Sequence, residues 1–178
     1  MIYSTDLSVA EFAAAVQEAL RKAGVEVVLS GGSCVSVWSN NAYRSDDIDL
    51  IPVGLATRVK IRRIMLELGF LEKNRYFVHP DQVLWVEFPS GPLGVGEEPP
   101  REISSLPQKT GMLRLLSPTD CVKDRLTWWY HNNDRQGLEQ AVAVAQRHRV
   151  DIAELRRWSA GEGCAAEFEL LCKRLEPS

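Results

Sequence analysis

The chain has 178 residues, a formal net charge of −3 and 25% charged residues, as in an ordinary globular protein. This length suffices for one domain with its own core, or for a compact domain with a helical tail. No apolar run approaches the roughly 20 residues of a membrane span and no secretory signal is recognisable, so we expect a cytoplasmic protein without a membrane contact. The small negative charge argues against attraction of nucleic acid over the whole surface. The four cysteines are widely spaced and indicate neither a zinc site nor a disulfide framework.

Helix and strand patterns alternate in the first part of the chain. Ser8 and Glu11 form a capping-box pattern, and the apolar stripe that follows predicts a helix. The β-branched and alternating runs after it predict strands, because such side chains fit a pleated sheet. The expected elements are, in order, a helix ending at Gly24, a strand over residues 25–30, a short helix over 34–39, a strand reaching Pro52 and a helix over 56–68. This order favours an α+β fold with a mixed sheet and helices on one face.

The rest of the chain changes from strands to helices. Residues 76–78 and 83–88 are aromatic and β-branched, and the turn between them predicts a hairpin. Residues 89–111 are rich in proline and glycine, which predicts a loop or lid. A short strand over residues 112–116 precedes several helices, the first of them capped by Ser117. The two expected parts are a domain over residues 1–111 and a C-terminal helical region over residues 112–178 packed on it.

Two neighbouring motifs combine a phosphate-sized turn with a carboxylate pair. The first strand runs into Gly31 and Gly32, and Ser33 can cap the helix that follows. Free amide groups at a helix start favour a phosphate, although such a turn alone is more often only a tight connection. On the next strand Asp47 and Asp49 share one face, where two carboxylates repel each other unless a cation lies between them.

The order of strand, Gly-Gly-Ser, short helix and Asp-x-Asp strand resembles the nucleotidyltransferase superfamily related to DNA polymerase beta. Arg44 and Ser45 before the aspartates look most like the branch that contains abortive-infection toxins and other small stand-alone nucleotidyltransferases. The resemblance is specific over residues 27–52 and thinner up to the helices after Ser117. It implies transfer of a nucleoside monophosphate from a nucleoside triphosphate to a hydroxyl acceptor, with two magnesium ions as cofactors. The branch alone implies a toxin role with an antitoxin-like protein partner.

The resemblance also assigns residues to the site. Gly31, Gly32 and Ser33 are the predicted nucleotide-binding turn. Arg44 either approaches the triphosphate or pairs with nearby carboxylates to hold the turn. Asp46 points away from the carboxylate pair in an extended strand, so we expect its side chain to be solvated.

The family's third acidic residue lies on a neighbouring strand between apolar residues, and Val86-Glu87-Phe88 is the best match. Asp47, Asp49 and Glu87 are therefore the predicted metal ligands and catalytic residues. Family members often have aspartate at the third position, so Glu87 departs from the pattern by one methylene group. The alternative is an outward-facing glutamate on an edge strand, with the third carboxylate in the proline-rich loop.

The helical region contains a second polar group. Asp120, Lys123 and Thr127 share one side of the first predicted helix, and Asp134 opens the next helix, so Lys123 and Asp134 can lie close together. In the toxin-like branch a lysine and a later aspartate lie near the nucleotide, and these two residues match them. An exposed helix salt bridge is an equally good interpretation.

Taken with the resemblance, the motifs predict a magnesium-dependent nucleotidyltransferase. The pattern favours none of the three acceptor classes, which are an RNA end, a protein side chain and a small molecule. The alternative is a non-catalytic sensor or scaffold that keeps the fold and binds nucleotide without turnover. That alternative depends mainly on Glu87, because this residue departs from the family pattern.

Overall fold

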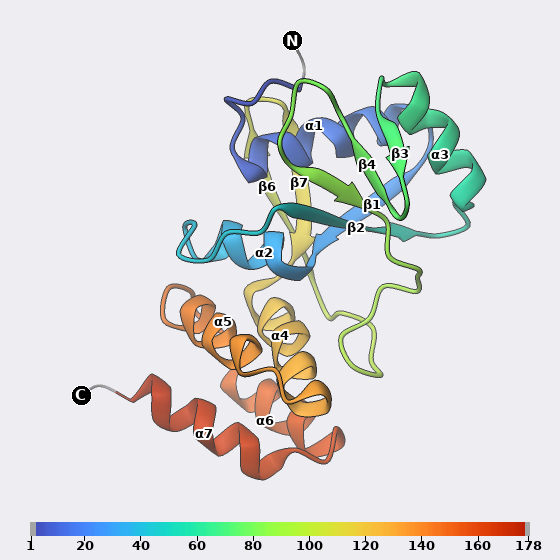
Figure 1. Cartoon of the computed structure of the whole chain (residues 1–178). Helices are drawn as coiled ribbons and strands as arrows, with labels where there is room; N and C mark the ends of the chain where they lie inside the picture. Colours follow the sequence, from blue (N-terminus) through green and yellow to red (C-terminus); the bar gives the residue numbers. More distant parts are fainter. Residues whose placement is uncertain (1–2, 177–178) are drawn as a thin grey trace.

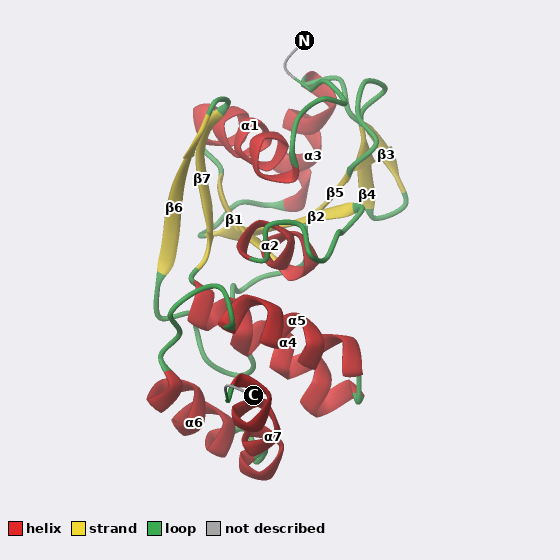
Figure 2. Ribbon diagram, turned by 90° about the vertical axis from the view of Figure 1, so that its left-hand side faces the viewer, coloured by secondary structure: helices red, strands yellow, loops and turns green. Residues whose placement is uncertain are grey.

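The computed structural model describes residues 3–176, which form a seven-stranded mixed sheet with helices before, between and after its strands (Figures 1 and 2). The elements are, in chain order, α1 (Val9–Lys22), β1 (Glu26–Ser30), α2 (Gly31–Trp38), β2 (Asp47–Val53), α3 (Arg58–Glu67), β3 (Leu71–Lys73), β4 (Tyr76–Val78), β5 (Trp85–Glu87), β6 (Ile103–Gln108), β7 (Gly111–Leu116), α4 (Pro118–Asn132), α5 (Arg135–Ala145), α6 (Ile152–Gly161) and α7 (Ala165–Leu175). The α+β class, the mixed sheet and the C-terminal helical region are confirmed. None of the helices described is long and apolar enough to cross a membrane.

The strand order is β3-β4-β5-β2-β1-β7-β6, which places the two motifs of the sequence side by side. β2 pairs antiparallel with β1 and parallel with β5, so Asp49 lies opposite Ser30 on one side and opposite Glu87 on the other. β4 and β5 form the predicted antiparallel hairpin, with Tyr76 opposite Glu87. Because directly opposed residues share a face of a sheet, the side chains of Asp49, Glu87 and Tyr76 project from one face.

The sheet has helices on both sides in the two views, and not on one face as expected: α1 and α3 lie on one side, and α2 and the helical region lie on the other (Figures 1 and 2). α1 begins with the predicted capping box, in which the Ser8 hydroxyl accepts from the Glu11 amide and the Glu11 carboxylate accepts from the Ser8 amide. Phe12 and Leu20 on its apolar stripe are fully buried. Burial of side chains of this size contributes roughly 1.5–3 kcal/mol each, so α1 holds the sheet firmly on that side.

The helical region begins at α4, where Ser117 is the N-cap and Pro118 the first residue, as predicted. α4 and α5 cross closely at Gly137. A Cβ atom on this residue would lie only 2.5 Å from the carbonyl oxygen of Arg125, so the absence of a side chain permits the approach. α6 packs on the end of α4 through Tyr130, whose ring stacks on that of Trp158 at a centroid distance of 5.9 Å. The region is thus a packed unit rather than an extended tail.

The structure corrects several predicted boundaries. α2 begins at Gly31 instead of Cys34, because β1 continues directly into the helix without a separate turn. The predicted loop over residues 89–111 contains β6, whose half-buried and exposed residues on the sheet edge give only a weak apolar signal. The edge strand β3 was not predicted. β7 lies between β1 and β6, so the sheet continues past residue 111, where the domain boundary was predicted, to Leu116.

Candidate active site

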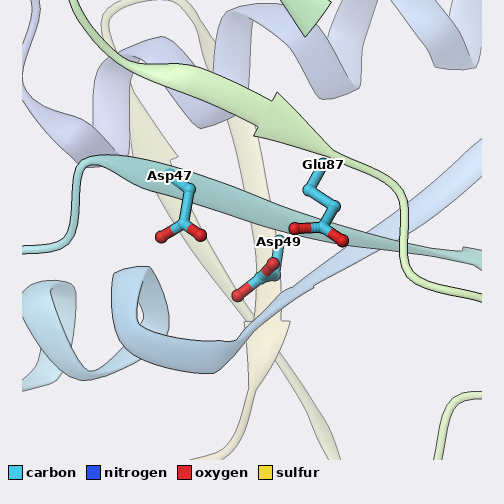
Figure 3. Close-up of side chains that lie close together, drawn as sticks. All are labelled: Asp47, Asp49 and Glu87. Carbon is cyan, nitrogen blue, oxygen red and sulfur yellow. The ribbon is translucent and has the colours of Figure 1, made fainter. Parts of the chain in front are cut away.

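Three carboxylates meet on the face of the sheet where β2 and β5 run side by side. Asp47 and Asp49 project from β2, and Glu87 projects from β5 directly opposite Asp49 (Figure 3). Each offers an oxygen atom, and these atoms all lie within 4.8 Å of one another. The predicted position of Glu87 on a neighbouring strand is therefore confirmed. Its metal-binding role stays a prediction.

Asp49 is affected both by burial and by the negative charge of its neighbours. Burial, followed by the negative charges of Asp47 and Glu87, raises the pKa of Asp49 to about 7. Asp47 is held by Ser45, whose hydroxyl donates to Oδ1 at 2.6 Å. Arg75 gives Glu87 a cationic neighbour, with its Nε atom 3.3 Å from Oε2, but its side chain is 65% exposed. Three crowded carboxylate oxygens are a donor set that fits a divalent cation such as magnesium.

Gly31 brings the start of α2 against this carboxylate group. Its φ angle is +65°, and a Cβ atom at this position would lie 2.0 Å from Oδ2 of Asp49. Glycine is therefore required by the backbone conformation and by the close approach of Asp49. The first amide groups of α2 have no partner within the helix, and the N-cap residue Ser30 makes no side-chain cap. A helix start with free amide groups thus lies beside the carboxylates.

Two residues of the predicted turn have other roles than expected. Ser33 does not cap the helix: its hydroxyl donates to the carbonyl oxygen of Asp47, which ties α2 to β2. Gly32 is a helical residue without a positive φ angle, and a Cβ atom there would lie 2.8 Å from the hydroxyl oxygen of Ser45. Both residues therefore help to place the strand that carries the aspartates.

Arg44 and Asp46 lie at the edge of the site and are exposed. Arg44, Ser45 and Asp46 line one side of an open pocket of about 350 Å³, next to the beginning of β2. The exposure of Asp46 agrees with its expected solvated position. A nucleotide contact of Arg44 stays a prediction.

The expected proximity of Lys123 and Asp134 is wrong. The Lys123 side chain is fully buried, with Nζ 2.7 Å from Oε1 of Glu154 and 3.6 Å from Oδ1 of Asp120. Asp134 caps α5, where its carboxylate accepts from the amide of Gln136. A contact of Lys123 with a phosphate requires this buried ion cluster to open. Asp120, Lys123 and Glu154 instead join α4 to α6.

The structure places a different pair of α4 beside the carboxylates. The charges of Asp124 and Arg125 act on Asp49: Asp124 raises its pKa and Arg125 lowers it. Arg125 is mostly buried, and its Nη2 atom lies 2.6 Å from the carboxylate of Asp124. This pair was not predicted from the motifs. The sequence feature that could have indicated this pair is Cys121, which is buried. Residues three and four positions later, Asp124 and Arg125, lie on the same side of a helix as Cys121.

The fold can be compared with those of known proteins. No protein-family model matches the sequence, and no curated protein matches it. An antigenic nucleotidyltransferase-like protein from Paracoccidioides brasiliensis superposes with a TM-score of 0.57 and 14% identity, over 80% of this chain and 77% of that chain. The chain has the nucleotidyltransferase fold. This agrees with the superfamily that the motifs resemble.

Two solved structures of the antibiotic-resistance factor ANT(2″)-Ia are also similar, with TM-scores of 0.49 and 0.47. Their identities are 16% and 13%, and the matches cover 87% and 90% of this chain and 92% and 95% of those chains. One of them contains adenylyl-2″-tobramycin. Within the nucleotidyltransferase fold, assignment to the toxin-like branch stays a prediction.

Proposed function

We propose that the chain is a magnesium-dependent nucleotidyltransferase, which moves a nucleoside monophosphate from a nucleoside triphosphate to a hydroxyl acceptor. The observation that carries this proposal is the group of Asp47, Asp49 and Glu87, whose oxygens lie within 4.8 Å on this fold. These three carboxylates are the residues that would hold the magnesium ions. When bound, two such ions neutralise the phosphate charge and align the acceptor oxygen with the α-phosphate.

The chain's own residues have distinct tasks in this reaction. The start of α2 offers its amide groups to the triphosphate, and Gly31 lets the Asp49 carboxylate lie against that helix start. Arg44 and Arg125 are the cations proposed to neutralise the phosphates. The acceptor oxygen forms a bond to the α-phosphorus while the bond from that phosphorus to the bridging oxygen breaks, and pyrophosphate leaves. Glu87 takes the proton of the acceptor hydroxyl directly or through water.

A non-catalytic nucleotide sensor is the second candidate, and one contact favours it. The Nε atom of Arg75 lies 3.3 Å from Oε2 of Glu87, and the positive charge of Arg75 partly neutralises this third carboxylate. A sensor would bind nucleotide through Asp47 and Asp49 and keep Glu87 paired with this arginine. It would release no pyrophosphate with any acceptor.

The deciding experiment combines calorimetry with product analysis. We expect the protein to bind nucleoside triphosphate in magnesium and not in chelator, because bare carboxylates repel the phosphates. The Asp47→Ala/Asp49→Ala variant should lose this binding. A labelled triphosphate with magnesium and a cell extract should yield a labelled acceptor, whereas binding without any labelled product would favour the sensor.

The proposal has two further parts. The protein acts inside a cell, where nucleoside triphosphates are available, and its partner is an antitoxin-like protein.

A further inference from the structure

A single row of opposed residues crosses five strands of the sheet and passes through the candidate active site. It runs from Ser30 to Asp49, Glu87, Tyr76 and Lys73, each directly opposite the next. Neighbouring strands lie about 4.8 Å apart, so these side chains are spaced evenly along one face. The helix start at Gly31 lies at one end of the row, and the β3–β4 hairpin lies at the other (Figure 1).

The hairpin end carries two aromatic rings, the exposed Trp85 and the half-buried Tyr76. Trp85 precedes Glu87 by two residues on β5 and therefore shares its face. Its side chain is 44% exposed, and its ring centroid lies 5.3 Å from that of the half-buried Tyr76. Trp85 is also directly opposite Asp47 in the sheet. Two aromatic rings, tilted by 55° relative to each other, thus adjoin two of the three carboxylates.

Two cations border this aromatic surface. The guanidinium carbon of Arg75 lies 4.8 Å from the Tyr76 ring centroid, and its Nη2 atom donates to the Tyr76 hydroxyl at 2.6 Å. Lys73 is exposed directly opposite Tyr76. Aromatic rings beside exposed cations are typical of proteins that bind single-stranded nucleic acid, in which bases stack on the rings and phosphates contact the cations.

We propose that Lys73, Arg75, Tyr76 and Trp85 form the acceptor subsite, and that the acceptor is the 3′ end of a single-stranded nucleic acid. This inference rests on the proposed nucleotidyl transfer. The phosphates of the donor belong to the α2 end of the row, so the hydroxyl that attacks comes from the opposite side, next to Glu87. The base of the terminal nucleotide then lies over Trp85 and Tyr76, and its phosphate contacts Arg75 or Lys73. The product is a strand lengthened by one nucleotide, with pyrophosphate released.

The test measures binding of a 5′-labelled single strand of about ten nucleotides by fluorescence anisotropy at low salt. Trp85→Ala should weaken binding about tenfold, which corresponds to about 1.4 kcal/mol, because a stacking ring is lost. Trp128→Ala is the matched control, since Trp128 is equally exposed, at 49%, but lies on α4. That variant should bind the strand as the wild type does. Trp85→Phe keeps a ring and should restore most of the affinity.

A second set of measurements separates this inference from the proposed function. Trp85→Ala should change magnesium-dependent binding of nucleoside triphosphate by less than about twofold, because the proposed donor contacts are the carboxylates and the start of α2 and do not include the Trp85 ring. If the wild-type protein does not bind nucleoside triphosphate in magnesium, the proposed function itself is overturned. Equal strand affinity of the Trp85→Ala and Trp128→Ala variants would overturn only the acceptor subsite. Transfer of label to a protein or a small molecule at an unchanged rate in Trp85→Ala would overturn it as well.

RNA and DNA strands of the same sequence distinguish the source of the acceptor. Each is tested with a free 3′ hydroxyl and with that hydroxyl removed. We expect both forms to bind equally and only the first to be lengthened, because the missing oxygen is the attacking atom. Lengthening of a strand without its 3′ hydroxyl would contradict the assignment.

Discussion

At the scale of single residues, Gly31 combines an unusual backbone conformation with a close approach to the carboxylate group. Its φ angle is +65°, and the space that a side chain would need is filled by the carboxylate of Asp49. A substitution here therefore has two effects, backbone strain and displacement of a proposed metal ligand. The same substitution at Gly54, where only the backbone strain applies, separates these two effects.

We predict that Gly31→Ala abolishes magnesium-dependent triphosphate binding, because the new Cβ atom would lie 2.0 Å from Oδ2 of Asp49. The left-handed backbone conformation adds roughly 1–2 kcal/mol of strain. Gly54→Ala is the matched control: its φ angle is +87°, but no atom lies within 4 Å of the added Cβ. It should lose similar stability and keep nucleotide binding, as measured by urea unfolding and calorimetry. Normal binding in Gly31→Ala would show that the close approach has no functional importance.

We also predict that Glu87→Gln lowers turnover by about two orders of magnitude while leaving much of the triphosphate affinity. The amide has nearly the same size, but it is a poorer metal ligand and accepts no proton. Pyrophosphate release with a working acceptor is the measurement, and Asp46→Asn is the control, because that carboxylate is exposed beside the site. Full activity of Glu87→Gln would mean that the third carboxylate lies elsewhere.

At the scale of elements, the sequence predicted the strands of the site better than its helices. The alternation in β2 and the apolar neighbours of Glu87 place both on one sheet face, since the side-chain period of a strand is two residues. The pairing of β2 with β5 is a long-range contact that no local pattern encodes, and only the resemblance suggested it. The edge strands β3 and β6 were missed because short, half-exposed strands lack a strong apolar pattern.

The error at α4 has a different cause. A charged residue on a helix is assumed to face water, which placed Lys123 outside and left Asp124 and Arg125 without a role. In the structure Lys123 is fully buried because Asp120 and Glu154 compensate its charge. Glu154 is 31 residues away in the chain, so no local pattern indicates this pairing. The pattern therefore predicted the helix and assigned its polar residues to the wrong faces.

The N-cap of α5 provides an element-scale prediction for Asp134. Its carboxylate accepts from the amide of Gln136, so Asp134→Ala should lower the free energy of unfolding by about 1 kcal/mol. Asp134→Ser keeps a capping oxygen and removes the charge, and it should restore stability. Both variants should bind nucleotide normally, as measured by calorimetry. Weaker nucleotide binding in the stable serine variant would instead support the nucleotide-contact role suggested by the resemblance.

At the scale of the whole molecule, one ion cluster joins the proline-rich segment after β5 to the helical region. Arg157 of α6 forms a two-pronged contact with Glu98, and the carboxylate of Asp120 accepts from the amides of Arg101 and Glu102. Glu154 lies at the centre, 2.7 Å from Lys123 and 2.8 Å from Arg101. Because the segment follows directly from Glu87, the cluster also fixes one side of the candidate site.

The last prediction concerns Glu154→Gln. The neutral amide leaves the buried Lys123 with only Asp120, at 3.6 Å, so the free energy of unfolding at neutral pH should fall by roughly 3–5 kcal/mol. Arg157 and then Lys123 lower the pKa of Glu154 to about 2, well below the ordinary value near 4.3. Its contribution is therefore present above that ordinary pKa and is lost as the pH falls toward 2.

Urea unfolding between pH 7 and pH 2 tests both parts, because the variant lacks the group that titrates. The loss of stability on acidification should be shallower in Glu154→Gln than in the wild type. Glu139→Gln is the control, since Glu139 forms an exposed pair with Arg174 and should change stability by no more than about 1 kcal/mol. A Glu154→Gln variant that matches this control, with the same acid dependence as the wild type, would mean that Lys123 and the proline-rich segment are held by packing alone.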